Sequence, residues 1–222
     1  APRNYDGRYR GLVRLDEALS RSLNVPFVRL LRRIGLDPFL GALRAMDVGL
    51  SDTPGRYGLS AAIGGVEMSP IELAGVYAAL ATDGRYRPLR YTRGGATACP
   101  NCPGLHIVAP GAAWLTRQTL RRRDRPDFPR RRQVAGTPAE IFWKTGTSAG
   151  HRDAWAAGGS ATLTGVVWTG NFDRTASAGL VGSEAAAPIL FDLLEASAGP
   201  NRDFVDPRPS DLVEVQVCAW SG

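Results

Sequence analysis

Residues 141–169 read IFWKTGTSAGHRDAWAAGGSATLTGVVWT, and this stretch decides the fold. Three short runs within it, 141–147, 154–158 and 163–169, are predicted to be β-strands because they are apolar, partly β-branched and bounded by Gly and Ser. Only a few residues separate one run from the next. Parallel strands need a longer crossover connection, so the three strands are predicted to pair in antiparallel hairpins.

Helices are expected both before and after these strands along the chain. The segment Ser69-Pro70-Ile71-Glu72 is a capping box with Pro just inside the helix start. Helices followed by an antiparallel sheet and a closing helix indicate an α+β (layered α/β) fold. The helices predicted from apolar spacing cover 15–22, 26–34, 38–46, 70–82, 110–123 and 183–196.

The composition is that of a folded protein with an unusual choice of basic residues. The 222 residues are 44% hydrophobic and 22% charged, with a net charge of +6. Lys144 is the only Lys, and every other basic residue of the 27 is Arg. A P-loop and a protein-kinase lysine are thereby excluded, and two His residues cannot form a three-histidine zinc site. Lys144 is either a cation that must be able to lose its proton or a stray Lys in an Arg-biased sequence.

The first candidate constellation is Ser22-Leu23-Asn24, which lies between two predicted helices. Within one helix, residues i and i+2 point in different directions and cannot serve one site. At a helix junction, which Pro26 is expected to enforce, a hydroxyl and a carboxamide can both face a cleft. Helix capping is the alternative role for Ser and Asn at such a position.

The second constellation is Lys144-Thr145-Gly146-Thr147-Ser148 on the first predicted strand. Side chains alternate along a strand, so Thr145 and Thr147 share one face and Lys144 takes the other. Two hydroxyls suit a substrate carboxylate, and the ammonium adds positive potential. Gly146 permits close approach of another backbone, and an edge strand of this kind can bind an extended peptide by strand addition. A hairpin with a Gly bulge is the structural alternative.

The two constellations together, S-x-N at Ser22 to Asn24 and K-T-G at Lys144 to Gly146, resemble the transpeptidase domain of class A penicillin-binding proteins, the 1C type in particular. The resemblance implies a penicillin-binding/β-lactamase-like transpeptidase fold. Residues 1–198 would be the C-terminal majority of that domain, and 199–222 a linker with the start of a further module. The resembling stretches are 4–7, 18–26, 63–70 on to Gly84, 144–155 and 217–222.

The resemblance also implies a function. It is peptidoglycan D,D-transpeptidation through a Ser acyl-enzyme on D-Ala-D-Ala stem peptides, within a bifunctional glycosyltransferase/transpeptidase. The expected partners are stem peptides, β-lactams and the upstream part of the same protein, with no nucleic acid, metal or cofactor. The expected location is the periplasmic face of the bacterial inner membrane, with an anchor outside this sequence. The implied catalytic residues are Ser22, Asn24 and Lys144, and the implied substrate-binding residues are Thr145, Gly146, Thr147 and Ser148.

One departure from the family pattern is serious. The nucleophile of the family is the Ser of S-x-x-K, but Ile141 stands three residues before the only Lys, so this sequence contains no S-x-x-K. That segment is expected upstream, and the 222 residues alone are predicted to be inactive. A non-catalytic scaffold fragment is the corresponding alternative.

Three further features have competing interpretations. The arginines of 121–132 could bind an anionic surface or nucleic acid, or form a solvated loop. The segment 146–150 fits the G-x-S-x-G of α/β-hydrolases, but that motif needs a helix directly after Ser148. Cys99 and Cys102 could form a local disulfide, bind zinc or remain free thiols.

Overall fold

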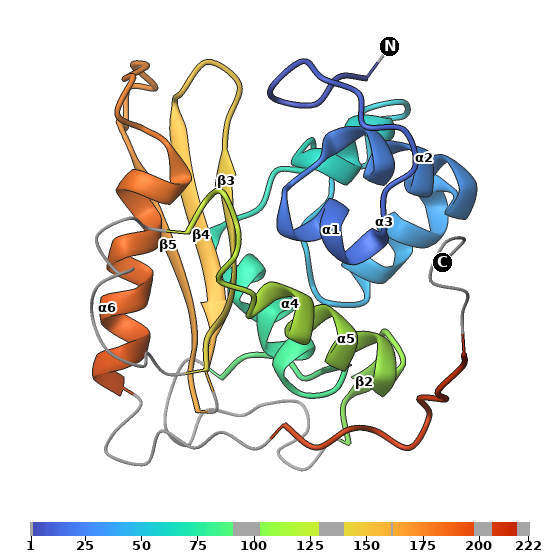
Figure 1. The fold of residues 1–222 in the computed structure, drawn as a ribbon. Helices are drawn as coiled ribbons and strands as arrows, with labels where there is room; N and C mark the ends of the chain where they lie inside the picture. The colour runs from blue at the N-terminus through green and yellow to red at the C-terminus, as the bar shows by residue number, and fades with distance from the viewer. Residues whose placement is uncertain (1, 91–102, 129–139, 161, 198–205, 217–222) are drawn as a thin grey trace.

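The computed structural model describes residues 2–90, 103–128, 140–160, 162–197 and 206–216. Figure 1 shows one layer of sheet with helices on both sides. The elements in chain order are α1 (Leu15–Ser20), α2 (Asn24–Ile34), α3 (Leu36–Arg44), the 3-10 helix η1 (Leu59–Ile63), α4 (Pro70–Ala81), β1 (Arg85–Tyr86), β2 (Leu105–His106), α5 (Pro110–Leu120), β3 (Phe142–Thr147), β4 (Asp153–Gly159), β5 (Thr164–Gly170), the π-helix η3 (Gly182–Ala186) and α6 (Ala187–Ser197).

The predicted antiparallel sheet is confirmed, with strand order β3-β4-β5. α6 covers one face and α4 the other, as Figure 1 shows. The faces can be assigned from single contacts: Phe142 stacks on Tyr77 of α4, with 6.3 Å between ring centroids. On the opposite face, a Cβ placed on Gly165 would lie 3.1 Å from the Leu190 side chain of α6, so Gly165 lies directly beneath this helix and a larger residue would displace Leu190. The expected α+β fold is therefore confirmed.

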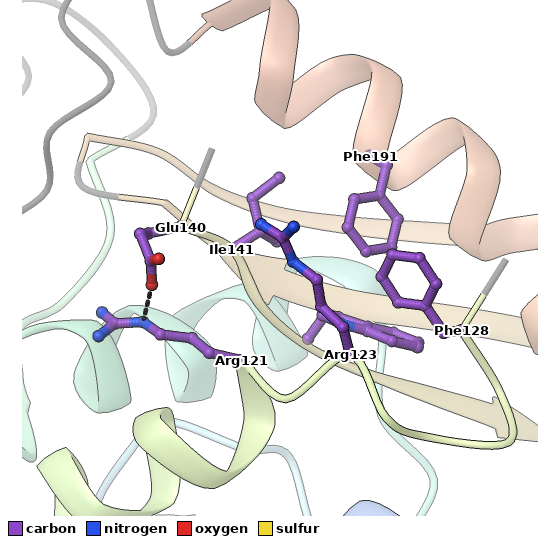
Figure 2. Close-up of a pocket in the computed structure, with 7 residues that line it drawn as sticks. Arg121, Arg123, Phe128, Glu140, Ile141 and Phe191 are labelled. Carbon is purple, nitrogen blue, oxygen red and sulfur yellow. Dashed lines mark ion pairs between the residues drawn. The ribbon is translucent and has the colours of Figure 1, made fainter. Parts of the chain in front are cut away.

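The core between the sheet and α6 is built on three aromatic rings. Trp143, Phe128 and Phe191 pack edge to face, with centroids 5.3–6.0 Å apart. Figure 2 shows Phe128 against Phe191, with the Arg121–Glu140 ion pair nearby. The cavity beside these rings measures only about 30 Å³, enough for a water molecule but not for a substrate.

Local sequence signals explain most helix ends. Ser69 and Glu72 form the predicted capping box, each side chain bonding to the other residue's backbone N–H. Gly35, at φ 97°, separates α2 from α3 as expected. The start of α2 was wrong: the helix begins at Asn24, two residues before the expected Pro26. Proline is tolerated there because the N–H groups of a first helical turn have no partner in the helix.

The described C-terminal segment, residues 206–216, packs along α5. Asp206 is 7% exposed and bonds to Arg117 (2.7 Å) and Arg121 (2.9 Å), while the Trp114 indole donates to its carbonyl. The alternating residues 213–217 were expected to begin a module that lies outside this sequence; residues 213–216 pair with no strand of the described part, and that expectation stays a prediction. The proposed division at residue 199 stays a prediction. No helix in the described part of the chain is long and apolar enough to cross a bilayer.

We expect Asp206→Ala to destabilise the protein by about 3 kcal/mol, because it leaves the buried Arg117 and Arg121 without their shared carboxylate. Urea unfolding measures this change. Glu214→Ala is the matched control: Glu214 also pairs with an arginine, but it is 84% exposed, so its loss should cost less than about 1 kcal/mol. Equal effects of the two substitutions would contradict an anchoring role for Asp206.

Candidate active site

The K-T-G motif lies on β3, the edge strand of the sheet. Lys144 is on the face turned toward α4, and Thr145 and Thr147 are on the face turned toward α6. The predicted alternation is therefore confirmed. Gly146 lies opposite Trp155 of β4, and a Cβ built on it would lie 3.5 Å from the Trp155 side chain, so Gly146 is not required there by crowding.

The backbone of β3 presents alternate residues to its outer edge. Ser148 N–H donates to Asp153 O at 2.9 Å, so Ser148 faces β4. Backbone groups alternate along an antiparallel strand, and Thr147, the preceding residue, therefore turns its N–H away from β4. By the same alternation, the carbonyls of Trp143 and Thr145 also point to the outer edge.

Side chains occupy the first part of this edge. Arg125 Nη1 donates to Trp143 O at 2.8 Å, and Lys144 Nζ donates to Thr145 O at 2.9 Å. A peptide adding to β3 would find these two carbonyls already bonded. The strand addition expected from the sequence is thus limited to the end of β3 near Thr147.

Arg125 fixes the loop before β3 to the edge of the strand. Its side chain is completely buried, lies 3.8 Å from the Trp143 ring centroid and also donates to Leu120 O. The other side of its guanidinium makes two parallel bonds to Asp127, at 3.0 and 2.8 Å. Sequence reasoning missed this clamp, for which the only local sign is the short spacing between an Arg and an Asp around Pro126.

Asp127 brings a negative charge to the K-T-G motif. Its Oδ2 accepts from Thr145 Oγ1 at 2.8 Å and lies 3.9 Å from Lys144 Nζ. Burial alone would raise the pKa of Asp127. The hydrogen bonds and positive charge of Arg125, together with the charge of Lys144, lower that pKa by more than burial raises it, so the pKa of Asp127 lies below its ordinary value. Asp127 is therefore a carboxylate at neutral pH.

The surroundings of Lys144 favour the first of the two interpretations of its uniqueness, a cation that is largely removed from solvent and able to lose its proton. Its side chain is 18% exposed. Burial lowers the pKa of Lys144 to about 8, Asp127 opposes this shift, and Arg125 adds to it. At neutral pH most molecules carry the ammonium, but a modest rise in pH removes the charge.

All three hydroxyls in the motif have partners within the protein, and Thr145 Oγ1 donates to Asp127 as described above. Thr147 Oγ1 accepts from Gly182 N–H at 3.0 Å. Ser148 Oγ accepts from the N–H groups of Arg152 (3.2 Å) and Asp153 (2.8 Å), and so closes the turn between β3 and β4. Since Ser148 leads into a hairpin and not a helix, the α/β-hydrolase alternative is wrong.

Ser22 and Asn24 lie where α1 meets α2. Ser22 is exposed in the left-handed region at φ 54°, and Asn24 is the first residue of α2, donating to Arg3 O at 3.1 Å. A residue that sequence reasoning did not single out holds this junction: the buried side chain of Asn4 accepts from Val25 N–H at 3.1 Å.

α5 connects the two candidate constellations because it contacts both α1 and β3. No hydrogen bond or ion pair between described residues joins Ser22 or Asn24 to Lys144. Their meeting in one groove stays a prediction. A separate groove of about 640 Å³ lies between α1 and α5, and none of the predicted site residues lines it.

Most of the described arginines in the basic run of residues 121–132 form ion pairs within the protein. Arg121, Arg122 and Arg125 pair with carboxylates at 2.7–2.9 Å. Arg130, Arg131 and Arg132 lie outside the described residues, as do Cys99, Cys102 and Cys218. No cluster of three or more potential metal ligands occurs in the described part of the chain.

Residues 2–172 match the family model of the penicillin-binding protein transpeptidase domain. The chain belongs to this family. The curated relatives with this domain include penicillin-binding protein 1C of Escherichia coli K12, 34% identical over the whole chain, and penicillin-binding protein 1F of Bacillus subtilis, 28% identical over 93% of the chain. The chain covers 28% and 30% of these two proteins, respectively.

Solved structures of penicillin-binding proteins have the same fold. Penicillin-binding protein 1A of Haemophilus influenzae aligns with a TM-score of 0.74, at 19% identity, over 94% of this chain and 38% of its own. PonA1 of Mycobacterium tuberculosis, solved in complex with penicillin V, aligns with a TM-score of 0.73, at 20% identity, over 95% of this chain and 63% of its own. The expected penicillin-binding transpeptidase fold is confirmed.

We expect the side chain of Lys144 to titrate near pH 8, and the ¹⁵Nζ chemical shift follows this directly, with Lys144→Arg assigning the signal. The unfolded chain holds this proton up to about pH 10.5, so it binds more protons than the folded protein between pH 8 and 10.5. The Lys144 contribution to stability should therefore rise with pH across that window. A midpoint near 10.5 would show that the ammonium is not desolvated.

Proposed function

We propose that this chain supplies the substrate-binding part of a serine D,D-transpeptidase that cross-links peptidoglycan. The observation that carries the proposal is the largely buried Lys144, 3.9 Å from Asp127, on an edge strand that also carries Thr145 and Thr147, in a chain of the transpeptidase family. The whole protein would be a bifunctional glycosyltransferase/transpeptidase at the periplasmic face of the inner membrane. The chain spans less than a third of the two curated relatives named above, so these properties are proposed for the complete protein.

The proposed reaction proceeds in two steps. The Ser of an S-x-x-K segment outside this sequence attacks the carbonyl carbon between the two D-Ala residues of a stem peptide. The C–N bond breaks, the terminal D-Ala leaves as an amine that takes up a proton, and an ester remains on the Ser. The amine of a neighbouring stem peptide then attacks the ester, forms the new peptide bond and returns the proton to the Ser.

Four of the predicted residues have distinct roles in this scheme. The Thr147 N–H, at the outer edge of β3, would bind the oxyanion of each tetrahedral intermediate, together with an N–H of the nucleophile segment. Ser22 would pass the proton to the leaving amine, and Asn24 would bind a substrate amide. Lys144 would supply positive potential beside both the Ser22 hydroxyl and the substrate carboxylate.

The donors available at β3 suit a ligand that ends in a carboxylate. Lys144 has an ammonium, and the Thr147 hydroxyl, which accepts from Gly182 N–H, keeps its own proton for donation. Terminal D-Ala has such a carboxylate, and so do penicillins. β-Lactams are therefore proposed ligands of the complete protein, as penicillin V is of PonA1 in its solved complex.

We expect the isolated 222 residues to form no covalent adduct with a fluorescent penicillin, because this sequence has no S-x-x-K serine. The intact protein should form one adduct per molecule. Gel fluorescence and mass spectrometry distinguish these outcomes. A stoichiometric adduct on Ser22 or Ser148 of the isolated chain would overturn the assignment of the nucleophile.

In the intact protein, Lys144→Ala should slow acylation by about 100-fold or more, the size of effect expected when a positioned electrostatic group is removed. The matched control is Arg33→Ala, which removes an exposed cation from α2 and should leave the acylation rate unchanged. An unchanged rate in Lys144→Ala would remove Lys144 from the mechanism. If both variants lost the same fraction of the acylation rate, the effect would come from the net charge of the protein and not from the position of Lys144.

A further inference from the structure

The Asp127 carboxylate contacts two of the groups that are proposed to bind a ligand carboxylate. Its Oδ2 is 2.8 Å from Thr145 Oγ1 and 3.9 Å from Lys144 Nζ, so it already interacts with one hydroxyl and the ammonium of the K-T-G motif. Its side chain is 18% exposed, which places it at the border between the core and the site. The protein thus holds an internal anion beside the groups proposed to recognise an external one.

This internal anion changes what Thr145 can do. A hydroxyl has a single proton, and Thr145 donates its proton to Asp127. A carboxylate ligand needs donors, so Thr145 has none to offer while Asp127 is ionised. Thr147 differs, since its oxygen accepts from Gly182 N–H and its proton stays available. The two threonines, equivalent by strand alternation, are chemically different.

Arg125 holds Asp127 in this position. The two bonds between them, at 3.0 and 2.8 Å, come from a guanidinium that is also fixed by Leu120 O, Trp143 O and the Trp143 ring. Arg125 therefore keeps several contacts when the charge of Asp127 is removed. A substitution of Asp127 can therefore remove its negative charge while Arg125 still holds Leu120 and Trp143 together.

We propose that Asp127 is a specificity-determining residue that weakens recognition of the ligand carboxylate, by taking the Thr145 proton and offsetting one positive charge, and leaves Thr147 as the hydroxyl donor. This inference rests on the proposed function. Asp127 contacts the binding groups and not the reacting atoms, so its effect should depend on whether the ligand carries a carboxylate.

The test compares a penicillin with its methyl ester, which has no anionic carboxylate. The second-order acylation rate constant of the intact protein is measured for both compounds at pH 6, where the Lys144 ammonium is retained. The acid-to-ester ratio of these rate constants isolates carboxylate recognition from the chemistry of acylation. Thermal unfolding of each variant shows whether it is folded.

Asp127→Asn should raise the acid-to-ester ratio about tenfold, the change expected for one new hydrogen bond to a charged group. The amide oxygen can still accept from Arg125 Nε, while the NH₂ replaces Oδ2, gives up the bond from Arg125 Nη2 and can donate to Thr145 Oγ1, which frees the Thr145 proton for the ligand. Asp127→Ser, which also removes the charge, should raise the ratio as well and serves if the Asn variant does not fold.

Two further variants locate the donor. The gain should disappear in the double variant Asp127→Asn/Thr145→Val, because the freed proton is then absent. Thr147→Val should lower the ratio in the otherwise unchanged protein. An unchanged ratio in both folded Asp127 variants would overturn the inference while acylation itself upheld the proposed function. Absence of any acylation in the unchanged protein would overturn both.

Discussion

The buried guanidinium of Arg125 is the interaction on which the candidate site depends. It lies 3.8 Å from the Trp143 ring centroid, donates from Nη1 to the carbonyls of Leu120 and Trp143, and binds Asp127 through Nε and Nη2. A buried charge is costly unless it is fully paired, and here a carboxylate, two carbonyls and an aromatic face pair it. Arg125 and Asp127 are thereby held against the first part of an edge strand.

This clamp divides the edge of β3 into two parts. The carbonyls of Trp143 and Thr145 are bonded by Arg125 and Lys144, and the Thr147 N–H points outward beyond them. An extended peptide that added to β3 would therefore find an unoccupied backbone group only at the strand end, at the Thr147 N–H. The same clamp brings Asp127 close to Lys144, so burial and a carboxylate act on the Lys144 pKa in opposite directions.

Much of this could be predicted from local sequence because it depends on local rules. Strand alternation placed Lys144 opposite to Thr145 and Thr147, and the capping box placed the start of α4 at Ser69. The pairing of S-x-N with K-T-G indicated the family, which the match over residues 2–172 shows. Each of these signals lies within a few neighbouring residues or in a motif.

The missed features are contacts between segments distant in sequence or exceptions to a local rule. The bond from Asn4 to Val25 and the packing of Asp206 on α5 depend on tertiary structure, which no residue spacing encodes. The tail looked like a linker because Pro, Asp and Arg are common in linkers, yet one buried Asp fixes it. The start of α2 was predicted at Pro26 and lies at Asn24, because proline is as acceptable inside the first helical turn as at its start.

The central claim is that the Ser22 hydroxyl and the Lys144 ammonium, on opposite sides of α5 in the chain order, serve one reaction centre. A crystal structure of the complete protein acylated by a penicillin tests this most directly. The account predicts Ser22 Oγ and Lys144 Nζ within about 3 Å of each other, beside the acylated serine, with the penicillin carboxylate at Thr147. A structure in which the acyl group lies away from β3, or in which Ser22 faces bulk solvent far from Lys144, would contradict it.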